Sequence, residues 1–208
     1  IKKTMDEPLS FDLYHPEPLM IVISGPSGVG KDSVLHALMK RSLPLHFVVT
    51  ATTRSPRPDE VDGRDYFFVS LQEFERMIAA DELLEYAVVY NQYKGIPKKQ
   101  IRKAFESGLD VVLRVDVQGA ARLRSLYPQA VMIFLIPSSQ AEWIDRLEKR
   151  NSETPENLVL RLQTARRELD SMKTFDCVVL NAHERLEEAV DNIVAIIQAE
   201  HHRVEHRK

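Results

Sequence analysis

The stretch from residue 19 to residue 33 constrains the fold of this chain more than any other. The apolar run 19–24 leads directly into a glycine-rich turn, which ends in a lysine at the start of a helical pattern. In this order, backbone N–H groups of the turn and the helix N-terminus surround phosphate, and the lysine reaches its outer oxygens. The G-x4-G-K spacing therefore predicts a nucleoside triphosphate site. We call this segment the phosphate loop; it comprises Gly25, Pro26, Ser27, Gly28, Val29, Gly30 and Lys31.

One residue departs from this motif. The position after the lysine normally carries Ser or Thr, whose hydroxyl binds Mg²⁺, but here it is Asp32, followed by Ser33. A carboxylate is a hard oxygen ligand that suits Mg²⁺ directly or through water. Alternatively, Asp32 repels the triphosphate and Ser33 holds the metal. The sequence leaves both interpretations open.

Composition excludes several classes of protein. The 208 residues suffice for one compact domain with a large core. A net charge of −3 gives no reason to expect a nucleic-acid or membrane-surface binder. The single cysteine, Cys177, excludes an intramolecular disulfide framework and suits an intracellular reducing compartment. No apolar run approaches the roughly 20 residues that span a bilayer.

Short apolar runs alternate with helical patterns along the chain, which predicts an α/β fold with a mostly parallel sheet covered by helices on both faces. Capping boxes at Ser70 and Ser139 mark two helix starts. The expected strands are 20–24, 47–51, 66–69, 84–90, 109–115, 131–136 and 176–180. The expected helices are 31–41, 71–80, 97–107, 118–126, 140–150, 155–173 and 184–200.

The segment 52–69 interrupts this alternation. It reads T-T-R-S-P-R-P-D-E-V-D-G-R-D-Y-F-F-V, and Arg54 and Arg57 stand three residues apart between prolines. Arginine suits bidentate recognition of phosphate, so the segment predicts an anion-binding lobe. The alternative interpretation is a solvated charged loop.

Together, these motifs resemble those of guanylate kinases. The matching stretches are G-P-S-G-V-G-K at 25–31, the whole of 52–69, L-E-Y-A at 84–87, V-D-V-Q-G at 115–119 and R-L-E-K-R at 146–150. The resemblance runs in order from residue 19 to residue 200. The pairing of G-V-G-K-D-S with L-R-V-D-V-Q-G resembles the plant organellar branch, which implies a plastid or mitochondrial location; otherwise we expect a cytoplasmic protein.

The resemblance also implies a division of the chain. It gives a P-loop-type parallel sheet flanked by helices, a small mixed β/α lobe that binds GMP, and a helical lid. The core would comprise 19–51, 109–137 and 174–200, the lobe 52–108 and the lid 138–173. Residues 1–18 would form a mobile tail, and 201–208 a C-terminal tail.

Site residues follow from the resemblance. The GMP site would consist of Thr50, Arg54, Arg57, Tyr66, Glu85, Lys94, Gly95, Ile96 and Asp116. Within it, Arg54, Arg57 and Tyr66 would hold the phosphate, while Thr50 and Glu85 would face guanine. A carboxylate suits guanine because N1–H and N2–H₂ are adjacent donors, whereas adenine presents an acceptor at N1.

On the ATP side, the resemblance adds a metal ligand and a set of arginines. Asp116 would orient Mg²⁺, together with Asp32 or Ser33. Asn181 would touch adenine. The residues expected to stabilise the transferring phosphoryl group are Lys31, Arg54, Arg146, Arg150 and Arg161.

Three positions depart from the family pattern. Family members usually carry Tyr, Gly and a small hydroxyl residue where this chain has Lys94, Gly95 and Ile96. Lys94 can replace a tyrosine hydroxyl with a charge, but the Ile96 side chain has no donor. Arg114 stands where the family commonly has Asp, two residues before Asp116.

The implied reaction is Mg²⁺-dependent transfer of the γ-phosphoryl group of ATP to GMP, and to dGMP. No catalytic base is required, because a phosphate monoester with a second pKa near 6 is already ionised. We expect ATP and GMP as partners, no nucleic acid or membrane, and a monomer in preference to an oligomer. Two alternatives remain: a phosphopeptide-binding module without catalysis, and a P-loop kinase with another phosphorylated acceptor.

Overall fold

The computed structural model describes residues 17–89, 91–148, 164 and 167–204. Its strands are β1 Met20–Ser24, β2 Leu45–Phe47, β3 Ala51–Thr52, β4 Phe67–Phe68, β5 Leu83–Val89, β6 Gln92–Pro97, β7 Asp110–Arg114, β8 Val131–Ile136 and β9 Cys177–Leu180. Its α-helices are α1 Lys31–Met39, α2 Leu71–Ala79, α3 Lys98–Glu106, α4 Val117–Leu126, α5 Gln140–Glu148 and α7 Leu186–Glu200. None of the helices in these ranges is long and apolar enough to cross a membrane.

A five-stranded parallel sheet forms the centre of the molecule, in the order β2-β7-β1-β8-β9. Strand β1 is the middle strand, paired with β7 through Ile21 and Val112 and with β8 through Val22 and Met132. All five residues of β1 are buried, as expected for an uninterrupted apolar run in a parallel sheet. The predicted α/β fold with a parallel sheet is therefore confirmed.

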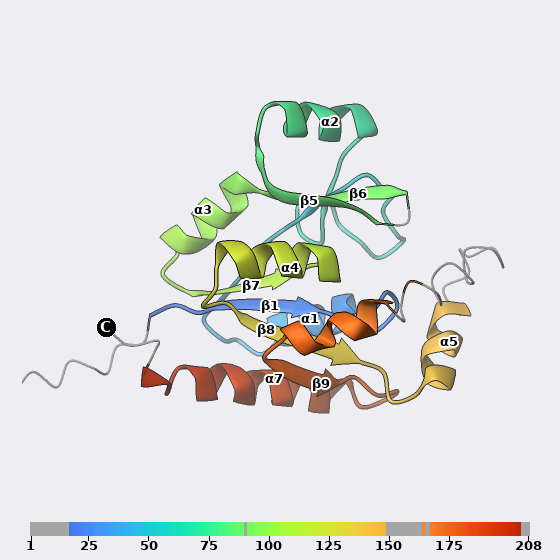
Figure 1. Cartoon of the computed structure of the whole chain (residues 1–208), viewed down its shortest axis with the longest axis vertical. Coiled ribbons are helices and arrows are strands. Elements are labelled where there is room, and N and C mark those ends of the chain that lie inside the picture. The colour runs from blue at the N-terminus through green and yellow to red at the C-terminus, as the bar shows by residue number, and fades with distance from the viewer. Residues whose placement is uncertain (1–16, 90, 149–163, 165–166, 205–208) are drawn as a thin grey trace, which may run out of the picture.

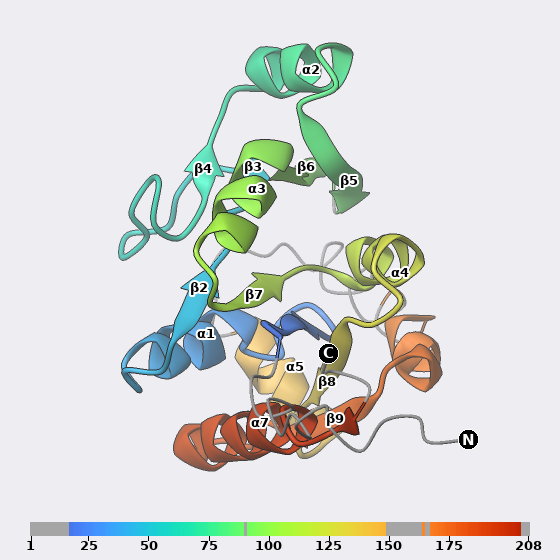
Figure 2. The ribbon, with the colours of Figure 1, turned by 90° about the vertical axis from the view of Figure 1, so that its left-hand side faces the viewer.

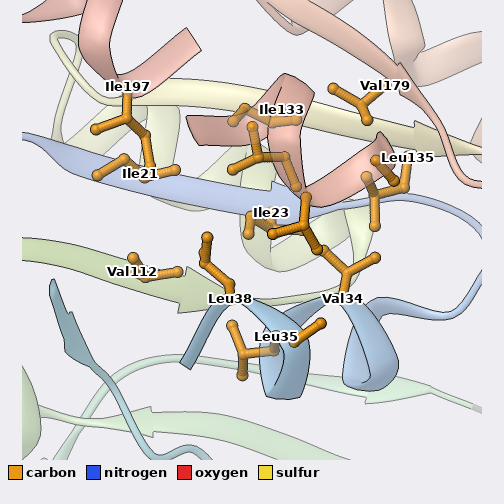
Figure 3. Packing of buried hydrophobic residues seen from close by; sticks show 14 of the residues in the cluster. Ile21, Ile23, Val34, Leu35, Leu38, Val112, Ile133, Leu135, Val179 and Ile197 are labelled. Atoms are coloured by element: carbon orange, nitrogen blue, oxygen red, sulfur yellow. The ribbon is translucent and has the colours of Figure 1, made fainter. Parts of the chain in front are cut away.

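Helices cover both faces of this sheet, so two apolar clusters form (Figures 1 and 2). On one face, α1 and α7 pack against the strands, with Leu38 and Ile197 contributing to the same cluster as Ile21 (Figure 3). On the other face, α3 and α4 contribute Ile101 and Leu123. Alternate residues of β1 point into the two clusters. This fixes the strand register, because a shift by one residue would turn each side chain to the opposite face of the sheet.

A second, four-stranded sheet has the order β4-β3-β6-β5. In Figure 1, α4 lies between this sheet and α7. Strands β3 and β4 are parallel, whereas β6 runs antiparallel to β3 and β5. Helix α2 covers this sheet with the fully buried Phe74. The Ser70 side chain accepts a hydrogen bond from the backbone N–H of Glu73 at 3.1 Å, which is one of the two bonds of the predicted capping box; the Glu73 carboxylate accepts from Arg76.

One expected strand is wrong in a way that matters for the site. The run 47–51 was expected to form a single strand, but the chain ends β2 at Phe47, leaves the central sheet, and enters the second sheet at Ala51. The apolar pattern continues because both sheets bury it. Thr50 lies in this crossing, between the two sheets.

Candidate nucleotide-binding site

Several of the predicted site residues follow directly after strands of the central sheet. The phosphate loop follows β1, Asp116 lies two residues after β7, and Asn181 follows β9. Because the strands are parallel, their carboxyl ends meet at one edge of the sheet, which is where ligands bind in such folds. The topology therefore gathers residues that are more than 150 positions apart in sequence.

The phosphate loop has the backbone that its glycines permit. Gly25 has φ 140°, and a Cβ there would lie 2.5 Å from the carbonyl oxygen of Leu135 on β8. Gly30 has φ 96° and caps α1. The Lys31 ammonium folds back over the loop and donates to the carbonyl oxygens of Gly25 at 2.6 Å and Pro26 at 3.1 Å. Burial, reinforced by Lys94, lowers the Lys31 pKa to about 8.

Helix α5 packs behind this loop. The Trp143 indole N–H donates to the carbonyl oxygen of Ser27 at 2.7 Å, and Arg146 donates to that of Val29 at 3.0 Å. Arg146 also donates to the Asn181 carbonyl oxygen at 2.8 Å, and the Asn181 amide donates to Val29 at 2.7 Å. Arg146 and Asn181 are thus held together against the loop.

A cavity of about 340 Å³, the outer cavity, opens beside Arg146 and Asn181. It is also lined by Gly28, Gly30 and Ser33. Gly28, Gly30, Ser33 and Asn181 were predicted to bind ATP, and Arg146 to act on the transferring phosphoryl group; the structure brings all five together at the surface of one cavity. Asp145 and His183 line it as well, although no sequence motif marks either residue.

On the other side of Lys31 lies the central cleft, between the phosphate loop and the second sheet. Of the predicted residues it is lined by Ser27, Gly28, Lys31, Asp32, Arg54, Arg57, Tyr66, Lys94 and Asp116. Arg54 forms a bidentate pair with Glu60 at 2.6 and 2.5 Å. Its guanidinium also lies 4.8 Å from the centre of the Tyr66 ring. Arg54 is therefore largely buried and ion-paired, whereas residues 55–59 and 61–64 of the same segment are exposed.

The central cleft continues into an inner cleft lined by Thr50, Glu85 and Gly95, with Lys31, Tyr66, Lys94 and Asp116 shared between the two. Thr50 and Glu85 are buried polar residues. Burial and the nearby Asp116 raise the Glu85 pKa to about 8. Ile96 is different: its side chain is fully buried in the apolar cluster with Ile101 and does not line either cleft.

Two of the predicted metal ligands face the central cleft. Asp32 and Asp116 both line it, whereas Ser33 lines the outer cavity. The Asp116 Oδ1 also caps α4 by accepting from Gln118 N–H at 2.8 Å and Gly119 N–H at 3.1 Å. The described residues contain no group of three acidic, His or Cys side chains that holds a metal alone. Two carboxylates fit Mg²⁺, which is usually bound through one or two carboxylates together with substrate phosphates.

The sequence analysis also missed an acidic residue of the central cleft. Glu168 lines the central cleft, and its Oε2 accepts from the backbone N–H of Ser27 in the phosphate loop at 3.2 Å. Burial raises the Glu168 pKa, although Lys31 opposes this effect. Glu168 falls in an ordinary helical pattern, so no motif marks it. Arg150 and Arg161, predicted to close over the triphosphate, lie outside the described residues.

Comparison with known proteins identifies the family. The family model described as guanylate kinase matches residues 17–200. A "Guanylate kinase 2, chloroplastic/mitochondrial" of Oryza sativa subsp. japonica is 51% identical over 193 residues, covering 92% of this chain and 68% of the relative. A guanylate kinase of Caldanaerobacter subterraneus is 44% identical over 190 residues, covering 91% of each chain.

A solved structure agrees with this assignment. The crystal structure of guanylate kinase from Anaplasma phagocytophilum superposes with a TM-score of 0.75 at 28% identity, covering 94% of this chain and 92% of that one. The fold, the phosphate loop and the sequence comparisons thus agree with the resemblance read from the motifs: the chain belongs to the guanylate kinase family.

Proposed function

We propose that this chain transfers the γ-phosphoryl group of ATP to GMP, and to dGMP, in a Mg²⁺-dependent reaction. One observation carries the proposal: Lys31 of the phosphate loop lines both the central cleft and the inner cleft. A triphosphate on the phosphate loop and a nucleotide whose base lies beside Glu85 would therefore meet at the Lys31 ammonium.

The acceptor site recognises both the phosphate and the base of GMP. Arg54, Arg57 and Tyr66 bind its phosphate, and the Glu85 carboxylate accepts hydrogen bonds from guanine N1–H and N2–H₂. AMP would place an acceptor opposite Glu85 and leave a buried carboxylate unpaired, which costs binding. Lys94 lines both clefts and adds positive charge between the base and the phosphate.

The donor site binds ATP across the phosphate loop. Backbone N–H groups of residues 25–31 and the Lys31 ammonium hold the phosphates, and Asn181 borders adenine in the outer cavity. Asp116, with Asp32 or Ser33, would hold Mg²⁺, which supplies positive charge to the transferring group when it is bound. Glu168 must release the Ser27 N–H before phosphate occupies that position.

The chemistry is positioning and charge neutralisation. The acceptor phosphate is ionised at neutral pH, so no side chain needs to remove a proton. Lys31 and the arginines bring two polyanions together and stabilise charge on the transferring group. Closure of the site would exclude water, which competes with GMP as the acceptor.

The alternative functions are less well supported. A phosphopeptide-binding module does not need the phosphate loop, whereas here the loop is complete and is supported by Trp143, Arg146 and Asn181. A kinase for another phosphorylated acceptor does not need the buried Glu85.

Substitution of the loop lysine tests the proposal. Lys31→Ala should lower kcat by at least about a hundredfold, as loss of one preorganised charged donor does in other enzymes. Lys40→Ala, which removes an exposed lysine just after the same helix, should leave kcat unchanged. The assay measures ADP release with GMP as the acceptor, and then with dGMP, AMP, CMP, UMP and ribose bisphosphate as alternative acceptors. Near-normal activity of Lys31→Ala, or no preference for GMP, would refute the proposal.

The rice relative is called chloroplastic/mitochondrial, and we propose plastid or mitochondrial residence for this chain as well. Immunodetection in fractionated organelles would test this location. We also propose that the chain acts as a monomer, which sedimentation at assay concentrations would test.

A further inference from the structure

Arg114 is a buried cation that has no role in the function proposed so far. It is the last residue of β7, and its side chain is only 4% exposed. Its Nη2 donates to the carbonyl oxygen of Asp65 at 2.6 Å, and its guanidinium stacks on the Tyr66 ring at 4.0 Å from the ring centre. Arg114 therefore connects the central sheet to the segment that carries Tyr66.

The charge of Arg114 is balanced by Asp32. The Arg114 Nη1 donates to Asp32 Oδ1 at 2.6 Å. Burial alone would raise the pKa of the Asp32 carboxyl, but Arg114, Arg57 and Lys31 outweigh burial and hold it well below its usual range. The two residues that depart from the family pattern on the phosphate loop and at the end of β7 thus form one ion pair.

The same carboxylate contacts two of the residues assigned to the acceptor phosphate. Arg57 donates to Asp32 Oδ2 at 3.2 Å, and the Tyr66 hydroxyl donates to Oδ1 at 3.4 Å. Asp32 therefore stands beside the position that the GMP phosphate takes. Without Arg114, Arg57 would be its remaining ion-pair partner, and more of its negative charge would face that phosphate.

We propose that Arg114 is a positioning residue for the acceptor phosphate: it neutralises Asp32 and fixes the Tyr66 ring, so that the phosphate meets Arg57 and Tyr66 without a repelling carboxylate. The inference rests on the proposed function only in taking GMP as the acceptor. It assigns to the Asp32–Arg114 pair the task of making an acidic phosphate loop compatible with an anionic acceptor.

A double-mutant cycle tests this role at saturating Mg²⁺. Arg114→Met keeps the length of the side chain but removes its charge. It should raise the KM for GMP about tenfold, a modest part of what a unit charge at contact distance is worth near a protein surface, and change the KM for ATP less than about threefold. Asp32→Asn combined with Arg114→Met removes both charges and should return the KM for GMP to within about threefold of wild type.

The control is Arg124→Met. Arg124 also donates to an aspartate, Asp176, at 2.6 Å, but it lies where β8 and β9 begin, at the opposite edge of the sheet from the site. It should leave both KM values unchanged. If Arg114→Met does not fold, Arg114→Gln replaces it; glutamine removes the charge but can still donate a hydrogen bond, so the KM for GMP alone should rise.

Three results would overturn the inference. They are an unchanged KM for GMP in the Arg114 variant, an equal rise for both substrates, and a double variant no better than Arg114→Met. Failure of the proposed function looks different, because wild type would then not phosphorylate GMP. In that case melting temperatures still test the pair: Asp32→Asn alone, which leaves Arg114 unpaired, should melt below the double variant.

Discussion

The two substrates should respond to pH in opposite directions, because one buried acid and one buried base of the site both titrate near pH 8. The Glu85 pKa is raised to about 8 by burial and by Asp116. The Lys31 pKa is lowered to about 8 by burial and by Lys94. GMP binding requires an ionised Glu85, whereas ATP binding requires a charged Lys31.

The size of the effect follows from these values. At pH 7 only about 10% of Glu85 is ionised, and at pH 8 about half. The apparent affinity for GMP is the intrinsic affinity multiplied by this ionised fraction. The KM for GMP should therefore fall about fivefold from pH 7 to pH 8. GMP binding at pH 7 should release close to one proton, because guanine selects the carboxylate. The KM for ATP should rise about fivefold from pH 8 to pH 9, as Lys31 loses its charge.

Steady-state kinetics between pH 7 and pH 9 measure both slopes, and calorimetry in two buffers of different ionisation enthalpy measures the released proton. The GMP phosphate itself is almost fully ionised in this range and contributes little. Glu85→Gln is the matched control, since it keeps the shape but does not titrate. A wild-type KM for GMP that does not change with pH, or that follows the same slope in Glu85→Gln, would refute the reasoning.

Three further predictions concern the same site. Glu85→Gln should raise the melting temperature at pH 8.5 by at least about 2–4 °C, the shift that about 1 kcal/mol produces in a domain of this size, because a carboxyl group whose pKa is raised from 4.5 to about 8 on folding destabilises the protein as pH rises through that range; equal melting temperatures would contradict this. Gly30→Ala should raise the KM for ATP about tenfold, since its Cβ would lie 2.5 Å from the Asn181 Nδ2 at a φ of 96°; an unchanged KM would show that the loop adapts. Asp32→Ala should raise the Mg²⁺ concentration for half-maximal rate about tenfold while Ser33→Ala does not, since a carboxylate is the stronger ligand; the reverse pattern in a Mg²⁺ titration would assign the metal to Ser33.

The sequence predicted those parts of the fold whose signals are local. Strand β1 lies where the apolar run placed it, and the start of α2 has the cap expected at Ser70. The change of sheet between Phe47 and Ala51 has no local signal, because the residues are apolar whether they pair with one sheet or the other.

The site shows the same division. The phosphate loop and the arginines of 52–69 belong to short motifs, so the sequence could name them. Glu168 and Ser27 are 141 positions apart in the sequence, and Asp32 and Arg114 are 82 apart, so both contacts depend on tertiary packing. Each residue of that pair looked like an isolated departure, and only the fold shows that the two charges meet.

The Asp32–Arg114 pair also makes the stability cost of substitution depend on which partner is replaced first. If Asp32 is lost first, a guanidinium that is only 4% exposed remains without its counter-ion, and breaking such a buried pair costs about 3–5 kcal/mol. A typical domain has only about 5–15 kcal/mol of stability to lose. If Arg114 is lost first, the carboxylate that remains is 27% exposed and still contacts Arg57. Loss of the arginine first therefore costs less stability than loss of the aspartate first, although it weakens the acceptor site.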